Sequence, residues 1–434
     1  MLVEFKFSNF RSFKEEVIFS MEPTTSNKKN INTIQTNLKK IPELYRSSGI
    51  FGANASGKSN TLKAFAFFKY LIKNSAKFLL EDKIPQEQYA LSSKTEHQPM
   101  CFSIKFITNE TLFEYSVAIL NNSIQSESLY YTPISTTGSA QKNRIFEKNN
   151  INGSIQFKKS TGIPQSWINE TLDNRLFLSE IVNNRKCTIN NILNAYNWLT
   201  TKLIIADSKK LSGIFSLKQI LNGNGENIIQ LIKNTDLGIE DITVKEVDID
   251  EALKTTPDNS KKMLELISQI SHGKAKTLQA KSIHKTEDGQ FKEFDFQKTE
   301  SDGTNRLLSL SGPIWTALQN GEILIFDELD MALHPLLIKH LLSLFNNSEI
   351  NQRNAQIIFA SHAHYLMDSI HLSSDQIWFV SKELNNGFYS DLYSLSDFKL
   401  TKKQKNISFY DAYINGIYGA VPFIKKEKYG TDSK

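Results

Sequence analysis

The residues best suited to chemistry form a glycine-rich segment in the first part of the chain. Residues 52–59 read G-A-N-A-S-G-K-S and match the phosphate-binding pattern G-x-x-x-x-G-K-[ST] in full. Gly52 and Gly57 allow a tight turn that points backbone N–H groups at phosphates, while Lys58 supplies a positive charge. The Ser59 hydroxyl is suited to ligate Mg²⁺. The residues expected to contact a bound nucleotide are Gly52, Asn54, Ala55, Ser56, Gly57, Lys58, Ser59 and Asn60.

Two carboxylates follow an apolar run in the last third of the chain. Residues 323–326 are all apolar, and Asp327 and Glu328 come directly after them. This pattern is typical of a buried central strand that presents side chains at its carboxyl end, where ligands bind in open α/β sheets. We expect Asp327 to hold Mg²⁺ through water and Glu328 to polarise an attacking water. Alone, the pattern fits a solvated strand end equally well; the phosphate loop before it favours the catalytic interpretation.

A second anion site is predicted where Ser301-Asp302-Gly303-Thr304-Asn305-Arg306 precedes an amphipathic helix. Small hydroxyl and glycine residues at the start of a helix leave backbone N–H groups accessible to an anion, and Ser301 and Gly303 are the candidates. The alternative is that Ser301 only caps a structural helix.

One histidine stands at an expected strand end. His362 comes two residues after the mainly apolar strand expected at residues 356–360, and we expect that strand to end on the same edge of the sheet as Asp327. At this position the imidazole could hydrogen-bond a γ-phosphate or the attacking water. An isolated histidine would be interpreted as structural; the strand end favours a catalytic role.

These residues require a particular set of elements to position them. An α/β fold is predicted, with a mixed or parallel core sheet, an antiparallel β subdomain and an inserted helical lobe. A strand at residues 3–7 and a helix from the phosphate loop to about Leu80 are expected first. The other expected elements are a β-meander at 100–158, helices at 164–203, a surface turn at 256–259, a hairpin turning at Asp288-Gly289, and strands at 323–326, 356–360 and 376–380.

Composition excludes several classes of protein. The 434 residues include 51 Lys and Arg and 46 Asp and Glu, a net charge of +5 that does not by itself favour nucleic acid. The longest apolar stretches, such as residues 64–68, are too short to span a membrane. Glu4 and Lys6 argue against a secretory signal, and Cys101 and Cys187 form no disulfide or zinc pattern. We expect a cytoplasmic protein without a membrane partner, for which DNA remains an alternative partner.

Together these motifs resemble the ABC-type ATPase heads of the SMC and RecF group. Within that group the sequence is similar to bacterial AAA-family ATP-binding proteins related to the OLD ATPases, of the RloA and AbiL kind, over nearly the whole chain. The motifs that carry the resemblance are Asn9-Phe10-Arg11-Ser12-Phe13, Gly-Ala-Asn-Ala-Ser-Gly-Lys-Ser-Asn at 52–60, Ser-Asp-Gly-Thr at 301–304, Asp-Glu-Leu-Asp-Met-Ala-Leu-His-Pro at 327–335 and Tyr-Gly-Ala-Val-Pro at 418–422.

The resemblance implies a single ABC-type ATPase over residues 1–434 that uses ATP and Mg²⁺. Its first lobe is expected at about 1–160 plus 320–434, and its helical or insert lobe at about 161–319. Two chains, or a higher oligomer, would sandwich ATP in a composite site. In that site Lys58, Ser59, Asp327, Glu328 and His362 of one protomer face Ser301 and Gly303 of another. Asp330 corresponds to the subunit-coupling aspartate of the family and Arg11 to a basic residue near the phosphates.

The resemblance also implies a function in defence against phage. About 72 residues follow His362, which is short for the nuclease domain of the relatives that cut DNA. The expected function is therefore an ATPase that gates a separately encoded nuclease or toxin effector. Two alternatives stay open: a RecF-like or SMC-like clamp for DNA repair or chromosome maintenance, and the energy subunit of a membrane transporter.

Overall fold

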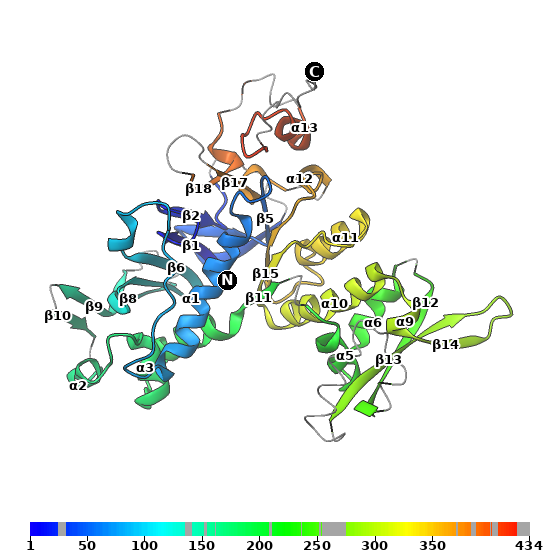
Figure 1. The fold of residues 1–434 in the computed structure, drawn as a ribbon, viewed down its shortest axis with the longest axis horizontal. Helices are drawn as coiled ribbons and strands as arrows, with labels where there is room; N and C mark the ends of the chain where they lie inside the picture. Colours follow the sequence, from blue (N-terminus) through cyan, green and yellow to red (C-terminus); the bar gives the residue numbers. More distant parts are fainter. Residues whose placement is uncertain are drawn as a thin grey trace, which may run out of the picture. The chain divides into compact units, whose positions relative to one another are not determined.

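The chain folds into sheets and helices that form two compact units (Figure 1). The first unit comprises residues 1–205, 325–327 and 356–434, and the second comprises residues 206–324 and 328–355. The expected α/β class is confirmed. The computed structural model describes residues 1–24, 32–134, 141–151, 154–160, 162–207, 211–235, 237–250, 253, 275–369, 372–382, 388–399, 401 and 407–422, so the surface turn expected at 256–259 lies outside the described residues.

The first unit contains an antiparallel sheet with the strand order β10-β9-β8-β7-β6-β1-β2. In β1 the side chains of Val3, Phe5 and Phe7 are buried and alternate with half-buried polar residues, as the sequence predicts. The meander expected at residues 100–158 is confirmed, and β1 and β2 extend it. The strands are β1 (Leu2–Ser8), β2 (Val17–Ser20), β6 (Met100–Thr108), β7 (Thr111–Leu120), β8 (Ser123–Pro133), β9 (Asn143–Ile151) and β10 (Ser154–Lys159).

A second sheet has the order β11-β15-β16-β5-β17-β18. Strand β5 is buried along its whole length and pairs in parallel with β16 and β17, whereas β17 and β18 are antiparallel. A mixed core sheet, as one of the two expected forms, is therefore confirmed. The strands are β5 (Ser47–Phe51), β11 (Leu203–Asp207), β15 (Ile323–Asp327), β16 (Gln356–Ala360), β17 (Ile377–Lys382) and β18 (Ser390–Ser394); β3 (Thr33–Leu38) and β4 (Ile41–Tyr45) form a separate two-stranded sheet.

Helix α1 (Lys58–Asn74) contacts β16 of the core sheet and packs on the antiparallel sheet through aromatic rings. The ring of Phe65 stacks on Phe5 with centroids 3.9 Å apart, and Phe68 stacks on Phe102 at 5.6 Å. The helix ends at Asn74 rather than near Leu80, because η1 (Ser75–Lys77) tightens the chain and the exposed Leu80 has no packing to hold another helical turn. These contacts fix the amino end of α1, where the phosphate loop ends.

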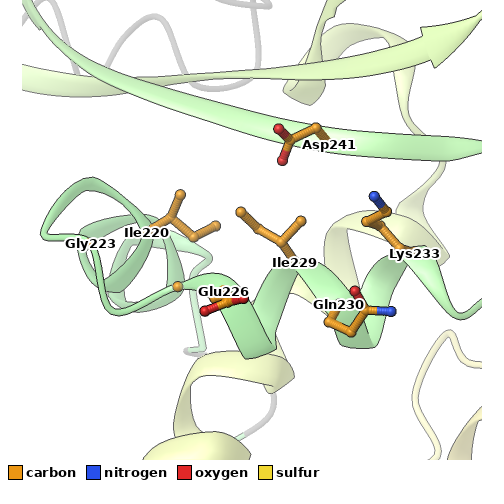
Figure 2. Close-up of a pocket in the computed structure, with 8 residues that line it drawn as sticks. Ile220, Gly223, Glu226, Ile229, Gln230, Lys233 and Asp241 are labelled. Atoms are coloured by element: carbon orange, nitrogen blue, oxygen red, sulfur yellow. The ribbon is translucent and has the colours of Figure 1, made fainter.

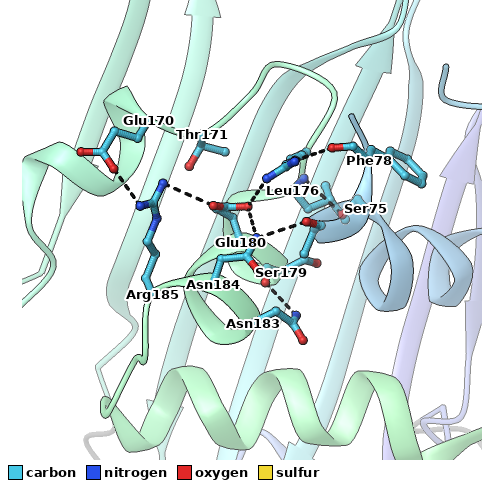
Figure 3. A network of polar contacts seen from close by, with 12 residues as sticks. Ser75, Phe78, Glu170, Thr171, Leu176, Ser179, Glu180, Asn183, Asn184 and Arg185 are labelled. Carbon is cyan, nitrogen blue, oxygen red and sulfur yellow. Dashed lines mark hydrogen bonds and ion pairs between the residues drawn. The ribbon is translucent and has the colours of Figure 1, made fainter. Parts of the chain in front are cut away.

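The helices after the meander pack within the first unit. Glu180 of α3 pairs with Arg175 at 3.0 Å and accepts a hydrogen bond from Asn184, and Arg175 also donates to the carbonyl of Phe78 beyond α1 (Figure 3). The bond from Arg175 to Phe78 joins these helices to α1 within the first unit, whose first segment runs to residue 205. The elements are α2 (Gln165–Asn169), α3 (Phe177–Asn184), α4 (Asn190–Asn197) and η3 (Trp198–Lys202).

A buried charged cluster holds the start of α3 to the sheet. Glu127 of β8 accepts hydrogen bonds from the backbone N–H groups of Phe177 and Leu178 at 2.6 and 2.9 Å, and from the Tyr115 hydroxyl at 2.9 Å. Lys148 lies opposite Glu127 in the β8–β9 register and is equally buried. Burial raises the pKa of Glu127, while the two amides and Lys148 oppose that shift. The cluster therefore stabilises α3 only while its acceptors and donors stay matched.

The second unit combines helices with a three-stranded sheet. Helix α10 packs on α5 and α6, and Gly312 makes this possible because a Cβ there would lie 2.5 Å from the Ser216 hydroxyl oxygen. The hairpin turn expected at Asp288-Gly289 is confirmed, with Gly289 at φ +79°. The elements are α5 (Ile214–Leu221), α6 (Glu226–Lys233), β12 (Ile239–Asp248), β13 (Lys276–Lys285), β14 (Phe291–Asp295), α9 (Phe296–Thr299), α10 (Asp302–Asn320) and α11 (Pro335–Asn346).

Short elements complete the described chain. They are η2 (Thr95–His97), α12 (Leu366–Ser369), η4 (Ser374–Gln376), η5 (Leu395–Asp397) and α13 (Phe409–Ile414), all in the first unit. Residues 328–355 belong to the second unit. Among the described residues, none of the helices combines the length and apolar character that crossing a membrane requires.

Candidate functional site

The phosphate loop connects the buried strand β5 to the first turn of α1. Gly52 has φ +146°, and a Cβ at that position would lie 2.3 Å from the carbonyl oxygen of Val380. Gly57 has φ +124°, and a Cβ there would lie 2.4 Å from the hydroxyl oxygen of Ser390. Both positions are therefore closed to any side chain, on conformational and on steric grounds. The loop is a tight backbone cradle of the kind that phosphate groups occupy at helix N-termini.

The side chain of Lys58 folds back onto the phosphate loop and binds its backbone. Its side chain is 6% exposed, and its ammonium group donates to the carbonyl oxygens of Gly52 and Ala53 at 2.8 and 3.0 Å. Asn54 and Ala55 are exposed at the tip of the loop, and Ala55 has φ +59°. The positive charge thus lies within the curve of the loop, where phosphate oxygens would compete with the two carbonyls for its protons.

Two serines from distant parts of the chain support the loop. Ser390, the first residue of β18, donates its hydroxyl hydrogen to the carbonyl of Ser56 at 2.5 Å and its backbone N–H to the carbonyl of Ser12 at 2.7 Å. The Ser12 hydroxyl in turn accepts a hydrogen bond from the side-chain amide of Asn60 at 2.9 Å. Asn60 therefore contacts the frame of the loop. The sequence motifs do not mark Ser390.

Two other predicted site residues of the first unit end neighbouring strands. Asp327 is the last residue of β15, which lies next to β16 in the core sheet. Ser361 follows β16 and donates its N–H to the carbonyl of Ile50, directly before the phosphate loop. His362 comes next and is exposed. The structure therefore places the turn that carries His362 beside the strand that leads into the phosphate loop.

Arg11 lies in the turn after β1 and has φ +52°. Its guanidinium pairs with Glu87 at 2.9 Å, with both side chains about one third exposed. The resemblance suggested that Arg11 is a basic residue near the phosphates. In this structure its guanidinium forms an ion pair with Glu87.

In the second unit, Ser301 is the N-cap of α10. Its hydroxyl oxygen accepts a hydrogen bond from the backbone N–H of Thr304 at 3.1 Å, so Ser301 caps the helix, as both interpretations of this turn allow. Gly303 lies in the first turn, where a Cβ would be 3.3 Å from the carbonyl oxygen of Ala332. Ser301 is exposed and Gly303 half-buried. The anion site expected at this turn, with Ser301 and Gly303 as its residues, stays a prediction.

A residue that the motifs did not reveal anchors this turn. Glu300, directly before Ser301, accepts a hydrogen bond from the Ser282 hydroxyl at 2.5 Å and shares another with the imidazole Nε2 of His284 at 2.8 Å. Ser282 and His284 both belong to β13. The three-stranded sheet therefore fixes the amino end of α10 through one carboxylate. The sequence offered no signal for this bond.

Glu328 also belongs to the second unit and has the left-handed backbone angle φ +52°. Arg306 of α10 is 7% exposed; burial lowers the pKa of its guanidinium, and the charge of Glu328 opposes that shift. Asp330 follows and is half-buried. In the sequence, Arg306 stands among the apolar residues of this helix, and a buried arginine requires a partner of opposite charge. That position was the signal from which its interaction with Glu328 could have been predicted. The structure thus groups the phosphate loop, Asp327 and His362 in one unit, and Ser301, Gly303 and Glu328 in the other.

The described residues contain no group of three or more His, Cys, Asp or Glu that could hold a metal ion by itself. Mg²⁺ in phosphate sites typically takes one or two protein ligands together with substrate phosphates and water. Ser59 in the first turn of α1 and Asp327 at the end of β15 supply oxygen atoms of the preferred kind. The residues therefore fit a magnesium ion bound together with a nucleotide.

An open pocket of about 410 Å³ lies among α5, α6 and β12 in the second unit (Figure 2). Asp241 faces Ile229 across it, with Glu226 and Lys233 at its sides. The charges are mixed, and the lining contains none of the motif residues. This pocket therefore belongs to the second unit's own surface rather than to the nucleotide motifs.

Comparison with known proteins gives one family match. The family model described as "AAA domain, putative AbiEii toxin, Type IV TA system" matches residues 47–368. No curated protein matches the sequence. A solved structure titled "Dimeric structure of a post-hydrolysis state of the ATP-binding cassette MJ0796 bound to ADP and Pi" aligns over 90% of this chain and 98% of that chain, at 10% identity and a TM-score of 0.25. A TM-score this low carries no argument about fold or function.

Proposed function

Since the chain belongs to the AAA family whose model spans residues 47–368, we propose that it is the ATP-binding and ATP-hydrolysing subunit of a bacterial defence or toxin-type complex. ATP-dependent oligomerisation would gate a separately encoded nuclease or toxin. The observation that carries the proposal is the phosphate loop between β5 and α1, with both glycine positions closed to side chains. The toxin named in the family description supports the link to an effector. The resemblance to the RloA and AbiL kind of ATPase supports the link to defence.

The phosphate loop is proposed to hold the β- and γ-phosphates of ATP. Backbone N–H groups at the start of α1 and the ammonium of Lys58 would bind the phosphate oxygens. Ser59 and Asp327 would hold Mg²⁺, which supplies charge neutralisation at the phosphates. His362, at the turn beside β5, would donate a hydrogen bond to the γ-phosphate.

Hydrolysis needs a base, and Glu328 is the proposed one. A carboxylate can polarise a water molecule by accepting a hydrogen bond from it, and Glu328 carries the charge that interacts with the buried guanidinium of Arg306. This role distinguishes Glu328 from Asp327, which is assigned to the metal.

The first turn of α10 is proposed to complete the site of a second protomer. Ser301 and the adjoining Asp302 are exposed, so the turn is accessible to the phosphates held by another chain. Ser301 and Gly303 would contact those phosphates through the hydroxyl and the backbone. A dimer with two shared ATP molecules follows from this arrangement.

Phosphate release and nucleotide binding test the assignment directly. Lys58→Ala is expected to lose nucleotide binding, whereas Glu328→Gln is expected to bind ATP, hardly turn it over and accumulate as an ATP-bound oligomer in size-exclusion chromatography. Lys63→Ala is the matched control, because Lys63 is an exposed lysine on the same helix. Turnover in Glu328→Gln equal to that of the wild type would refute the role of Glu328.

A pull-down separates the effector proposal from the clamp alternative. Tagged Glu328→Gln is incubated with Mg·ATP in host extract, and bound protein is identified by mass spectrometry and bound DNA by nuclease-sensitive absorbance. A stoichiometric nuclease-like or toxin-like protein supports the defence complex. DNA without such a protein, together with DNA-stimulated turnover that falls steeply with salt, supports the clamp instead.

A further inference from the structure

One buried tyrosine contacts residues that adjoin two parts of the proposed nucleotide site in the first unit. Tyr413 of α13 is 1% exposed. Its ring stacks on the imidazole of His364 with centroids 4.4 Å apart and planes at 23°, and on Phe379 of β17 at 5.5 Å and 4°. Its hydroxyl donates a hydrogen bond to the carbonyl oxygen of Ala420 at 2.9 Å. The ring of Tyr413 thus packs on His364 and Phe379, whereas its hydroxyl binds the backbone at Ala420.

The hydroxyl of Tyr413 is connected to the phosphate loop through the carbonyl oxygen of Ala420. The carbonyl of Ala420 also accepts a hydrogen bond from the backbone N–H of Ala53, the second residue of the loop, at 2.9 Å. The turn that presents this carbonyl is tight, with φ +65° at Gly419 and φ +55° at Ala420. The Tyr393 hydroxyl donates to the preceding carbonyl of Tyr418 at 2.8 Å. Two tyrosine hydroxyls therefore hold the turn that contacts Ala53.

The ring of Tyr413 is connected to the turn that carries His362 through its stack on His364. His364 donates its backbone N–H to the carbonyl of His362 at 3.0 Å, so the two histidines belong to one turn after β16. Because Tyr413 stacks on His364, displacing its ring would release one side of that turn. A single residue of α13 therefore touches the supports of both the phosphate loop and the predicted γ-phosphate ligand.

We propose that Tyr413 is a positioning residue of the nucleotide site, which holds the phosphate loop through Ala420 and the His362 turn through His364. The proposal rests on the proposed function, because it assigns the support of that same site. Burial raises the pKa of Tyr413 to about 12, so its hydroxyl keeps the proton it donates at neutral pH. Removing that proton donor would loosen the hold on Ala53 while the ring stays in place.

The isosteric variant Tyr413→Phe tests the hydroxyl alone. We expect the KM for ATP to rise about fivefold, the effect of losing one buried hydrogen bond, while kcat stays within about twofold. Hydrogen exchange at the amide of Ala53 is expected to accelerate in the nucleotide-free protein. Tyr410→Phe is the matched control on the same helix, because Tyr410 is 39% exposed, and it should change neither quantity.

A second variant tests the ring. Tyr413→Leu removes the stack on His364 as well as the hydroxyl, and it should lower kcat in addition to raising KM. A Tyr413→Phe protein whose KM and Ala53 exchange both equal those of Tyr410→Phe overturns the inference. A wild-type protein that binds no ATP overturns the proposed function instead, while the exchange of Ala53 still decides the role of the tyrosine.

Discussion

Replacing Gly57 with alanine is the sharpest perturbation of the phosphate loop. The new Cβ would lie 2.4 Å from the Ser390 hydroxyl oxygen, 2.9 Å from its Cβ and 3.0 Å from the Ser12 hydroxyl oxygen, at a residue with φ +124°. A left-handed backbone costs an L-residue about 1–2 kcal/mol, and overpacking costs about 1–3 kcal/mol. We therefore expect Gly57→Ala to destabilise the first unit by about 3 kcal/mol and to abolish nucleotide binding.

A control variant measures how much the left-handed backbone conformation alone costs in free energy of unfolding. Gly162 has φ +91°, but a Cβ there would meet only the Cδ1 atom of Ile189 at 3.7 Å, an ordinary contact. Gly162→Ala should therefore cost about 1–2 kcal/mol, the backbone term alone. The excess cost of Gly57→Ala measures the steric term.

A double-mutant cycle then identifies the obstacle. Ser390→Gly removes the atoms nearest the new Cβ, so the pair Gly57→Ala and Ser390→Gly should show a favourable coupling of about 1 kcal/mol. The cycle corrects for the hydrogen bond from Ser390 to Ser56 that the single variant loses. The remaining strain at Gly57 is not relieved, so recovery should be partial.

Urea unfolding measures these differences in the first unit alone if the fluorescence is restricted to it. Of the four tryptophans, only Trp315 belongs to the second unit. A Trp315→Phe background leaves the emission of Trp167, Trp198 and Trp378, all in the first unit. The reasoning is refuted if Gly57→Ala costs no more than Gly162→Ala, or if the coupling with Ser390→Gly is zero.

Two further outcomes are expected. His284→Phe keeps an aromatic ring but removes a partner of Glu300, so ATP turnover should fall about fivefold, while His284→Gln, which keeps a donor, should retain it; phosphate release at saturating ATP measures both. Glu127→Leu should destabilise the first unit by about 3–5 kcal/mol in urea unfolding because it removes the larger of the two carboxylate charges that act on the buried Lys148, whereas Lys148→Met should cost less because the carboxylate keeps its three donors. Equal turnover in both His284 variants, or the reverse order of stabilities, would contradict these expectations.

The elements with strong local patterns could be predicted from the sequence. Alternation marked β1, a Gly residue marked the β13–β14 turn, and the run before Asp327 marked a buried strand of the core sheet. Each of these signals depends on neighbours within a few residues. The end of α1 was predicted too late, because the exposure of Leu80 depends on the tertiary structure around it.

Partnerships between distant segments could not be predicted. The periodicity after residue 164 indicated helices, but their attachment to the rest of the first unit depends on bonds between distant segments, such as those from the amide of Phe177 to Glu127 and from Arg175 to the carbonyl of Phe78. The bond from Glu300 to β13 is of the same kind. A polar residue in the sequence carries no record of which backbone amide it will meet.

The frame of the phosphate loop shows why its glycines are visible in the sequence and its supports are not. Gly52 faces the carbonyl of Val380, and Ala53 donates to the carbonyl of Ala420; both oxygens belong to the backbone, which every residue type provides. Those contacts therefore depend on the path of the backbone and not on which side chains Val380 and Ala420 carry. At Gly52, in contrast, the contact excludes every residue with a Cβ. The recognisable motif therefore marks the two positions at which a side chain does not fit, and the atom nearest to each missing Cβ belongs to a residue more than 300 positions away in the sequence, Val380 for Gly52 and Ser390 for Gly57.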